Sequence, residues 1–479
     1  MGSEQVLSYF HEILKIPRPS YREGAIADYL EQFGRQRGLS VIRDPCNNVI
    51  IKKAGSSRVR PVVLQAHSDM VWVSDCAVPE GEEFPRGVHV ENGMLRAEGT
   101  SLGADDGIGA AMMLAVLEEE DPQFPPVEAV FTANEEETME GAMTLRPSYL
   151  SGEYLINLDS EEEGVLTIGA AGGISCVCTL PMGKRPSSLS HGMRLQISGG
   201  RGGHSGLEIQ EKRENAIQLL VRILRNLPQS GWELVKLEGG SRSNAIPAQA
   251  SALLNTSQPE SVQQAVAEFI ARHCHEWKDE EPGLEIQAIP AAPSEAAYAP
   301  EDTERICLLL ENLPHGVSRQ TPEFVCSSVN LAMLWEGEHE ISAELSLRSS
   351  FASWYHDEAK RIARLTRFLG GSVIEKDEYA AWQYQKDSHL LQVMRDAYRQ
   401  LFGKEAACEN VHAGVECGII MERCPSIREA ISIGPTIHGA HTTGEELDIA
   451  SVDRVYRLLC ETLRKLNSSS KEEPCDEQS

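Results

Sequence analysis

The sequence lacks the features that direct a chain into a membrane or the secretory route. It contains no run of about 18 apolar residues, the length that a spanning helix needs. The first residues, MGSEQVLSYFHEILKI, have no basic flank, no uninterrupted apolar core and no small-residue cleavage site, and so do not resemble a secretory signal. Val6 occupies the position where a myristoylation site requires Ser or Thr. We therefore expect a cytoplasmic protein with no membrane partner.

Positive charge is also scarce. The chain has 44 Lys and Arg against 72 Asp and Glu, which gives a formal net charge of -28. Long-range repulsion would oppose binding to nucleic-acid phosphates, so we expect no nucleic-acid partner. The 12 cysteines are scattered and form no disulfide framework, which a chain of 479 residues does not need. This length indicates two or three domains.

In the first 180 residues, helical and strand-like patterns alternate. We expect helices over residues 4–15 and 21–38 and a strand over residues 48–53. PVVLQAH, PVEAVFTA and YLINLD are continuous apolar runs of the kind found in strands that are covered on both faces. The pattern predicts an α/β fold with a mainly parallel sheet that is covered by helices on both faces.

The composition changes near residues 181–190, where PMGKRPSSLS is polar and rich in Pro and Ser, as a linker would be. Beyond it, alternating strands such as ISAELSLRSS are mixed with amphipathic helices such as ENAIQLLVRILRNL. Strand and helix patterns of the first type return near the carboxyl terminus. We therefore expect a catalytic domain in two parts, residues 1–188 and 386–479, interrupted by an α+β lid domain over residues 189–385.

Potential metal ligands follow the apolar runs, at the strand ends where open α/β sheets bind ligands. Imidazole combined with carboxylate suits zinc, cobalt or manganese, whereas a calcium site would consist of oxygen ligands. Two histidines and three carboxylates are too many for one tetrahedral ion but suffice for two ions that share one bridging carboxylate. The sequence thus predicts a two-metal site. The candidate ligands are His67, Asp105, Glu136, Asp159 and His441.

Each signal has an ordinary structural alternative. His67 with Asp69 could be a surface or capped-loop pair, and Asp105 could cap the helix that follows it. Asp159 could belong to a solvated acidic loop. Their joint placement favours the site, because three buried-strand candidates in succession end in a potential ligand.

Three adjacent glutamates, residues 135–137, follow another of these strands. They could form a charged loop, or they could divide metal binding from proton transfer. The spacing does not show which glutamate has which role.

Nine segments together resemble a known family. The chain is similar to the aminoacyl-histidine dipeptidases, which are also called Xaa-His dipeptidases and belong with acetylornithine deacetylase and the glutamate carboxypeptidases among the co-catalytic metallopeptidases. The motifs occur in order from near the amino terminus to the last helix. Asp106 replaces a frequent Asn and Thr138 a usual Gly, but neither change removes a ligand. The segments are QAHSDMV, GTSLGADDGIG, EEETMEGA, NLDSEEEG, AAGGI, GGHSG, SNAIP, HAGVECG and ISIGPTIHGAH.

The resemblance implies two divalent ions, with zinc as the first choice. His67 and Asp159 would hold one ion, Glu136 and His441 would hold the other, and Asp105 would bridge them. The resemblance favours His441 over His438, an imidazole three residues earlier that could compete for the same place.

The resemblance also implies catalytic and substrate-binding residues. Glu135 would be the general base, and Asp69 would orient His67 and fix its tautomer. In the lid, His204 would reach the developing oxyanion, Arg348 would bind the terminal carboxylate of the substrate, and Asn244 would contact the substrate. The ordinary alternatives are that GGHSG is only a turn and that Arg348 is only a charge on a strand face.

Two other groups of residues resemble functional sites. His273, Cys274 and His275 look like metal ligands but stand at the end of an amphipathic helix with no second pair nearby, which favours surface residues. His412 and Cys417 resemble a nucleophile pair. The family resemblance makes their segment a loop lining the cleft, and a cysteine hydrolase would leave the carboxylates unexplained.

These expectations combine into a cytoplasmic, metal-dependent dipeptidase that acts on small peptides of the Xaa-His type, including β-alanyl-histidine, and that could form a homodimer. The rivals are a related amidohydrolase, a tripeptidase, or a metal-binding scaffold without catalysis. Retention of Glu135 and of every expected ligand speaks against the scaffold.

Overall fold

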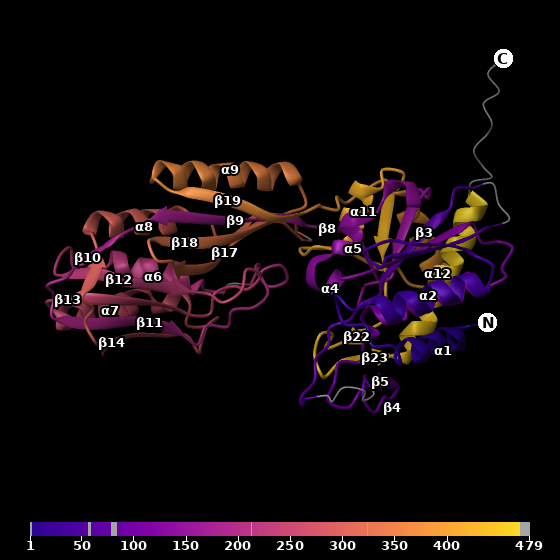
Figure 1. Cartoon of the computed structure of the whole chain (residues 1–479), viewed down its shortest axis with the longest axis horizontal. Helices are drawn as coiled ribbons and strands as arrows, with labels where there is room; N and C mark the ends of the chain where they lie inside the picture. Colours follow the sequence, from indigo (N-terminus) through magenta and orange to yellow (C-terminus); the bar gives the residue numbers. More distant parts are fainter. Residues whose placement is uncertain (1, 56–58, 78–83, 212, 323, 470–479) are drawn as a thin grey trace, which may run out of the picture. The chain divides into compact units, whose positions relative to one another are not determined.

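The chain divides into two compact units (Figure 1). The first unit contains residues 1–169, 384–410 and 415–479, and the second contains residues 170–383 and 411–414. The computed structural model describes residues 2–55, 59–77, 84–211, 213–322 and 324–469.

The first boundary lies earlier than the composition indicated. We expected the second unit to begin at residue 189, but β9 (Gly172–Pro181) already pairs along its length with β18 (Glu340–Ser349). The polar segment at 181–190 is not a linker, since it contains β10 (Lys184–Pro186), which pairs with β15 (Ala296–Tyr298). Proline is tolerated there because this sheet has only two strands, and an edge strand leaves part of its backbone unpaired. The later boundary, expected after residue 385, lies after residue 383.

The first unit is built on an eight-stranded mixed sheet in the order β1-β2-β6-β3-β7-β21-β8-β20. The four central strands, β6, β3, β7 and β21, run parallel to one another, which confirms the expected α/β class. The strands are β1 (Ser40–Arg43), β2 (Val49–Lys53), β3 (Val62–His67), β6 (Val127–Thr132), β7 (Tyr154–Asn157), β8 (Val165–Ala170), β20 (Ala407–Val411) and β21 (Glu429–Ser432).

Helices cover both faces of this sheet. On one face, α1 (Ser3–Ile13), α2 (Gly24–Gln36), α3 (Ala104–Glu118), α10 (His389–Phe402) and α12 (Ile449–Ser469) share one core with alternate strand residues such as Leu64. Gln65 points to the other face, where it hydrogen-bonds Glu416 at the start of α11 (Glu416–Arg423). There α11 contacts α5 (Glu140–Thr144) and β21 (Figure 1).

β3 and α3 form the buried centre of this unit. All six residues of β3 are buried, and α3 is buried from Ala104 to Leu117. A helix that is apolar on all sides belongs in the interior of a large domain. Each fully buried aliphatic side chain stabilises the fold by roughly 1.5–3 kcal/mol. The end of β3 and the start of α3 are therefore fixed points from which polar side chains can project.

A smaller sheet supports the loop that carries His441. It has four strands in the order β22-β23-β5-β4. Because β22 and β23 pair with each other, the loop between them begins and ends at one place. The strands are β4 (His89–Glu91), β5 (Met94–Arg96), β22 (Ile437–His438) and β23 (Glu446–Asp448).

The second unit is an antiparallel sheet with helices on one face, as an α+β insert should be. Nine strands take part, in the order β14-β11-β13-β12-β17-β18-β9-β19, with β16 paired to β17. Four helices share a single core with the sheet, and α9 (Ala352–Phe368) lies against β9 and β19 (Figure 1). The remaining elements are β11 (His191–Ser198), β12 (Trp232–Gly239), β13 (Ala250–Thr256), β14 (Glu285–Ala291), β16 (Gly316–Gln320), β17 (Val325–Glu336), β19 (Ser372–Tyr379), α6 (Ala216–Arg225), α7 (Pro259–His273) and α8 (Pro300–Asn312).

Within the part of the chain that the structure describes, no helix has the length and apolar character needed to cross a membrane.

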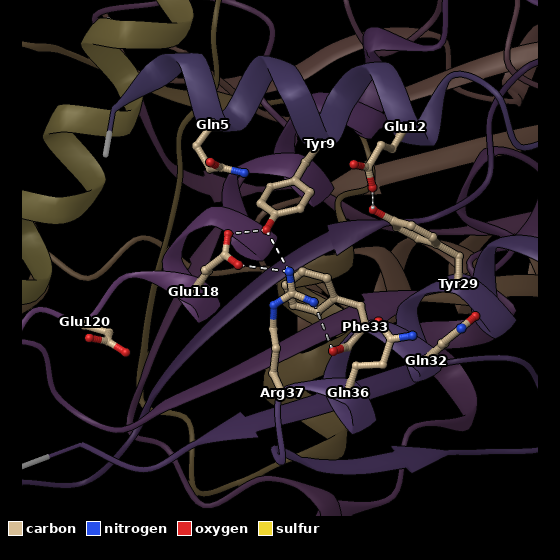
Figure 2. A pocket seen from close by; sticks show the side chains of 10 residues that line it. All are labelled: Gln5, Tyr9, Glu12, Tyr29, Gln32, Phe33, Gln36, Arg37, Glu118 and Glu120. Carbon is tan, nitrogen blue, oxygen red and sulfur yellow. Dashed lines mark hydrogen bonds and ion pairs between the residues drawn. The ribbon is translucent and has the colours of Figure 1, made fainter.

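A surface depression of about 770 Å³ lies over α1, α2 and the carboxyl end of α3 (Figure 2). Within it, Arg37 donates to Glu118 at 2.9 Å and to the Tyr9 hydroxyl at 3.1 Å. Glu118 is separated from Asp105 by nearly the whole of α3, about 20 Å at 1.5 Å per residue. The depression therefore lies far from the strand ends where the expected ligands stand.

Candidate metal centre

Acidic and imidazole side chains gather at the carboxyl edge of the parallel strands. His67 is the last residue of β3, and Asp159 follows shortly after β7. Glu135 and Glu136 open α4 (Glu135–Thr138) just after β6, and Asp105 stands at the start of α3. Parallel strands end at one edge of the sheet, so the topology brings these distant sequence positions together.

Asp105 belongs to two groups of potential metal-binding atoms. One group is His67, Asp105 and Asp159, and the other is Asp105, Glu136 and His441; in each, the donor atoms lie within 4.8 Å of one another. Nε2 of His67 lies 3.0 Å from Oδ1 of Asp105 and 3.4 Å from Oδ1 of Asp159. Nε2 of His441 lies 3.0 Å from Oδ2 of Asp105 and 2.9 Å from Oε2 of Glu136. The two oxygens of one carboxylate thus face two separate imidazoles.

This donor set fits two divalent cations. Each group offers one imidazole nitrogen and two carboxylates, and three protein donors are the usual number at a catalytic site. Burial and the nearby carboxylates raise the pKa of Asp159 to about 7. Oε1 of Glu136 is buried and has no hydrogen-bond partner among the described residues. Bound cations would offset the crowded negative charge and give such an oxygen a partner.

Asp69 contacts His67 and the two glutamates of α4. The Asp69 carbonyl accepts a hydrogen bond from Nδ1 of His67 at 3.2 Å, and the other ring nitrogen, Nε2, faces Asp105 and Asp159. The Asp69 carboxylate accepts from the backbone N–H groups of Glu135 at 3.0 Å and Glu136 at 3.2 Å, and from Ser20 Oγ at 2.8 Å. Burial alone would raise the pKa of Asp69, but the hydrogen bond and charge of His67 hold it below the usual value.

Glu135 and Glu136 face the same centre. Both join His67 in a third, overlapping group of donor atoms. The preceding residue, Asn134, has a left-handed φ of 57°, which turns the chain sharply between β6 and α4. Burial and the surrounding carboxylates raise the pKa of Glu135 well above the ordinary range. Glu137 is exposed and belongs to none of the donor groups found among the described residues.

Asp106 occupies the helix-capping role that the sequence left open for Asp105. Oδ1 of Asp106 accepts from the N–H of Gly109 at 3.1 Å, three residues ahead, as a helix cap does. Both aspartates have non-helical backbone angles, so the regular part of α3 begins after them. Asp105 is thereby free to turn its carboxylate toward the two histidines.

In the second unit, His204 is held as a neutral ring with one free donor. Its Nδ1 accepts from the backbone N–H groups of Gly206 at 3.2 Å and Leu207 at 3.3 Å, so the ring proton lies on Nε2. Burial, and then the charge of Arg348, lower the pKa of His204. Asn244 lies beside it: its backbone carbonyl accepts from Ser205 at 2.8 Å, and its side chain is exposed.

Arg348 is buried in the same unit and makes no ion pair with any described residue. It is 8% exposed on β18, and its Nη1 donates to the Tyr379 hydroxyl at 2.7 Å. Nε of Arg348 has no hydrogen-bond partner among the described residues. His412 hydrogen-bonds Ser328 at 2.7 Å, and burial followed by the charge of Arg348 lowers the pKa of His412 to about 4. The arrangement presents an unpaired positive charge suited to an anion.

Comparison with known proteins identifies the family. Residues 63–465 match the model of peptidase family M20/M25/M40. The chain is 32% identical over 478 residues to the cytosol non-specific dipeptidase of Escherichia coli, covering 97% of this chain and 98% of the relative.

The chain belongs to peptidase family M20/M25/M40.

Solved structures agree with this membership. The aminoacylhistidine dipeptidase of Vibrio alginolyticus superposes with a TM-score of 0.87 at 30% identity, covering 96% of each chain. A tripeptidase of Staphylococcus aureus shares the fold, with a TM-score of 0.57 at 17% identity over 98% of this chain and 99% of the other. The expected resemblance and the expectation of a metallopeptidase are confirmed.

In this M20/M25/M40 chain, the sequence offered other candidates for metal binding or catalysis: His438, His273, His275 and Cys417. His438 is exposed on β22 and belongs to none of the donor groups formed by described residues. Nδ1 of His273 lies 2.7 Å from the Glu276 carboxylate, and neither His273 nor His275 belongs to such a group. Cys417 is fully buried in α11, and burial raises the pKa of its thiol well above the usual range, which does not suit a nucleophile.

A buried polar network behind the site was not anticipated from the sequence. The carboxylate of Glu416 accepts from Gln65 at 2.6 Å and from Thr132 at 2.7 Å, and Gln65 accepts in turn from Asn157 at 2.6 Å. Burial, opposed by the Thr132 hydrogen bond, raises the pKa of Glu416 to about 8. The available signal was Gln65 itself, because a buried amide within an apolar strand needs a polar partner.

Proposed function

We propose that this chain is a dipeptidase that uses two divalent metal ions, with zinc as the first choice and cobalt or manganese as alternatives. The observation that carries the proposal is that the Asp105 carboxylate faces both His67 and His441 in a chain of a peptidase family. His67 and Asp159 would hold one ion, Glu136 and His441 the other, and Asp105 both. When bound, such ions polarise a peptide carbonyl and lower the pKa of a coordinated water.

Glu135 is the proposed proton carrier. Its backbone N–H is fixed by Asp69, and its carboxylate faces the same centre as Glu136. A carboxylate at this position takes a proton from the attacking water and returns it to the leaving amine. Asp69 is the proposed positioning group, since it contacts His67 and both glutamates.

His204, Asn244 and Arg348 are the proposed substrate contacts. The proton on Nε2 of His204 suits donation to the carbonyl oxygen as negative charge develops there. The planar fork of Arg348 suits a terminal carboxylate, and the absence of an ion pair within the described chain leaves this charge available. Asn244, exposed beside His204, would contact the peptide.

The proposed substrates are small peptides with a free carboxyl terminus, first of all Xaa-His dipeptides such as β-alanyl-histidine. Support comes from the printed names of two relatives, a non-specific dipeptidase and an aminoacylhistidine dipeptidase. The first relative is described as cytosolic, and we propose a cytoplasmic location for this chain too. With a net charge of -28, we propose no nucleic-acid or membrane partner.

Hydrolysis of a peptide panel by metal-stripped protein tests the function. The protein is reloaded with zinc, cobalt or manganese and offered dipeptides, tripeptides and acylated amino acids. Cleavage of dipeptides only after reloading supports the proposal, and a preference for carboxyl-terminal histidine supports the substrate class. Selective cleavage of tripeptides or acylated amino acids would contradict the proposed substrate class. Two bound metals without any cleavage would indicate a metal-binding scaffold without catalysis.

We also propose that the chain forms a homodimer, in which His204 reaches substrate in its own chain or in the partner chain. Mixing inactive Glu135→Gln and His204→Ala proteins distinguishes these arrangements. Activity recovered on mixing places His204 across the dimer, while two proteins that stay inactive together place it in its own chain. Sedimentation of the wild type as a monomer would contradict the dimer itself.

A further inference from the structure

The loop before Asp105 is held by a buried carboxylate from a distant part of the chain. Oε2 of Glu445 accepts from the backbone N–H groups of Leu102 at 2.7 Å and Gly103 at 2.8 Å. Oε1 accepts from those of Ala104 at 2.7 Å and Asp105 at 3.2 Å. Glu445 is only 3% exposed, so water does not compete for these bonds. Four consecutive backbone donors thus converge on one side chain.

A buried guanidinium binds a backbone carbonyl of the same loop. Arg18, which is 1% exposed, donates through Nη2 to the carbonyl of Gly103. Through Nη1 it donates to the carbonyls of Ser68, at 3.2 Å, and Asp69. The segment that carries His67 and the segment that carries Asp105 are therefore joined through one side chain.

Gly103 shows how tightly the loop is enclosed. Its φ is +77°, a left-handed conformation that favours glycine, and a Cβ at this position would lie 2.8 Å from Nη2 of Arg18. Its carbonyl meets Arg18 while its N–H meets Glu445. A larger residue would therefore disturb both contacts.

Glu445 also connects the loop to His441. The two residues lie four positions apart in the connection between β22 and β23, and the N–H of Glu445 closes a turn onto the Thr442 carbonyl at 3.3 Å. One short segment thus carries both the imidazole that faces Asp105 and the carboxylate that holds the Asp105 backbone.

We propose that Glu445 is a positioning residue that sets the bridging carboxylate Asp105 for both metal ions. Charged hydrogen bonds are the stronger kind, and four of them fix the backbone from which the Asp105 side chain projects. Partners that orient metal ligands commonly change metal affinity by about 10–100-fold when they are removed. Because Asp105 belongs to both donor groups, loss of Glu445 weakens both binding steps together.

The test compares Glu445→Gln with Glu446→Gln. Glutamine keeps the shape of Glu445 but offers one acceptor oxygen and an NH₂ group, so two of the four N–H donors lose their acceptor. Glu446, the next residue, lies in β23, pairs with Arg96 of β5 and belongs to none of the donor groups among the described residues, which makes it a matched control. Metal-stripped proteins are titrated with Zn²⁺ against a chromophoric chelator, and the absorption spectrum of the Co²⁺-loaded forms is recorded.

The expected result is a folded Glu445→Gln protein whose two Zn²⁺ affinities both fall about 10–100-fold and whose Co²⁺ spectrum changes, while Glu446→Gln matches the wild type. The inference rests on the proposed two-metal function, so the wild type must first bind two ions; failure there refutes that function instead. A folded Glu445→Gln protein with wild-type affinities overturns the positioning role. If Glu445→Gln does not fold, Glu445→Asp is measured in the same way. Failure of both to fold would assign Glu445 to stability alone and would also overturn the proposal.

Discussion

The strand-end site of the first unit and the group around Arg348 in the second unit, which contains His204, Tyr379 and His412, differ in charge and in the partners of their side chains. At the strand ends, carboxylates outnumber imidazoles, and Asp69 holds the backbone N–H groups of Glu135 and Glu136. In the second unit, a buried arginine lies among neutral imidazoles and has no carboxylate partner in the described chain.

The two regions therefore suit ligands of opposite charge. Crowded carboxylates with raised pKa values favour bound cations, whereas a buried guanidinium without an ion pair in the described chain favours a bound anion. Under the proposed function, the cations would polarise a peptide carbonyl and the guanidinium would bind a terminal carboxylate. Substitutions in one region, with the other left unchanged, test this difference.

The largest effect is expected from Asp105→Ala. Because Asp105 is common to both donor groups, its loss should reduce hydrolysis to the background rate even with excess zinc. His441→Ala removes a ligand from one group only and should leave one ion bound. The measurement is dipeptide turnover together with the metal content of the dialysed proteins. Substantial turnover by Asp105→Ala would remove the bridging role.

Glu135→Gln comes next. Loss of a general base should lower kcat by about 10²–10⁴-fold while both metal ions stay bound, because the proposed ligands are untouched. Steady-state kinetics and metal analysis check this outcome. The exposed neighbour in Glu137→Gln is the control and should keep the wild-type kcat. Equal losses in the two variants would indicate a general disturbance of α4 rather than a catalytic Glu135.

Arg348→Met tests the second region. Removing a buried charge that binds a carboxylate should weaken the free energy of substrate binding by about 2–5 kcal/mol. We expect this loss chiefly as a raised KM, with metal binding unchanged. The difference in KM between the wild type and Arg348→Met should vanish for amidated dipeptides, which lack the terminal carboxylate. Kinetics on matched acid and amide substrates provide the measurement, and an equal loss on both would refute carboxylate recognition.

His412 should make stability depend on pH. Burial, assisted by Arg348, lowers the His412 pKa from 6.5 to about 4, so the unfolded chain binds the extra proton between these values. His412 therefore has no effect on stability above pH 6.5, where it is neutral in both states, and it lowers the free energy of unfolding as pH falls toward 4, by about 3 kcal/mol in all. Urea unfolding of the wild type and of His412→Gln at several pH values measures the difference. Parallel pH profiles would show that His412 titrates normally.

The smallest effect is expected from Tyr379→Phe. This change removes the hydroxyl that accepts from Nη1 of Arg348, a bond worth about 1 kcal/mol, and should raise KM roughly five-fold at unchanged kcat. Initial-rate kinetics suffice to see it. A larger fall in kcat than in KM would place Tyr379 closer to the chemistry than to carboxylate binding.

The fold and the strand-end residues can be predicted from the sequence because buried strands are marked by continuous apolar runs. VVLQAH, PVEAVFTA and YLINLD indicated buried strands, and the polar residues that follow them had to share one edge of a parallel sheet. The start of the second unit was misplaced, because Pro and Ser in PMGKRPSSLS indicate a linker and an edge strand equally well.

The supporting residues could not be recognised in this way. Arg18 lies in a Pro-containing loop, and Glu445 is separated from Leu102 by most of the chain, so no local pattern connects them. Asp106 and Asp105 are adjacent acids, and only the backbone geometry shows which of them caps the helix. The roles of Arg18 and Glu445 depend on long-range contacts, which composition and periodicity do not encode.

A Zn²⁺ titration of the metal-stripped wild type alongside Asp105→Ala, followed by calorimetry, tests directly whether two ions share Asp105. We expect two ions per chain for the wild type and a loss of affinity at both steps for the variant. A single ion per wild-type chain, or a variant that still binds two ions with unchanged affinity, would contradict a metal pair that shares Asp105.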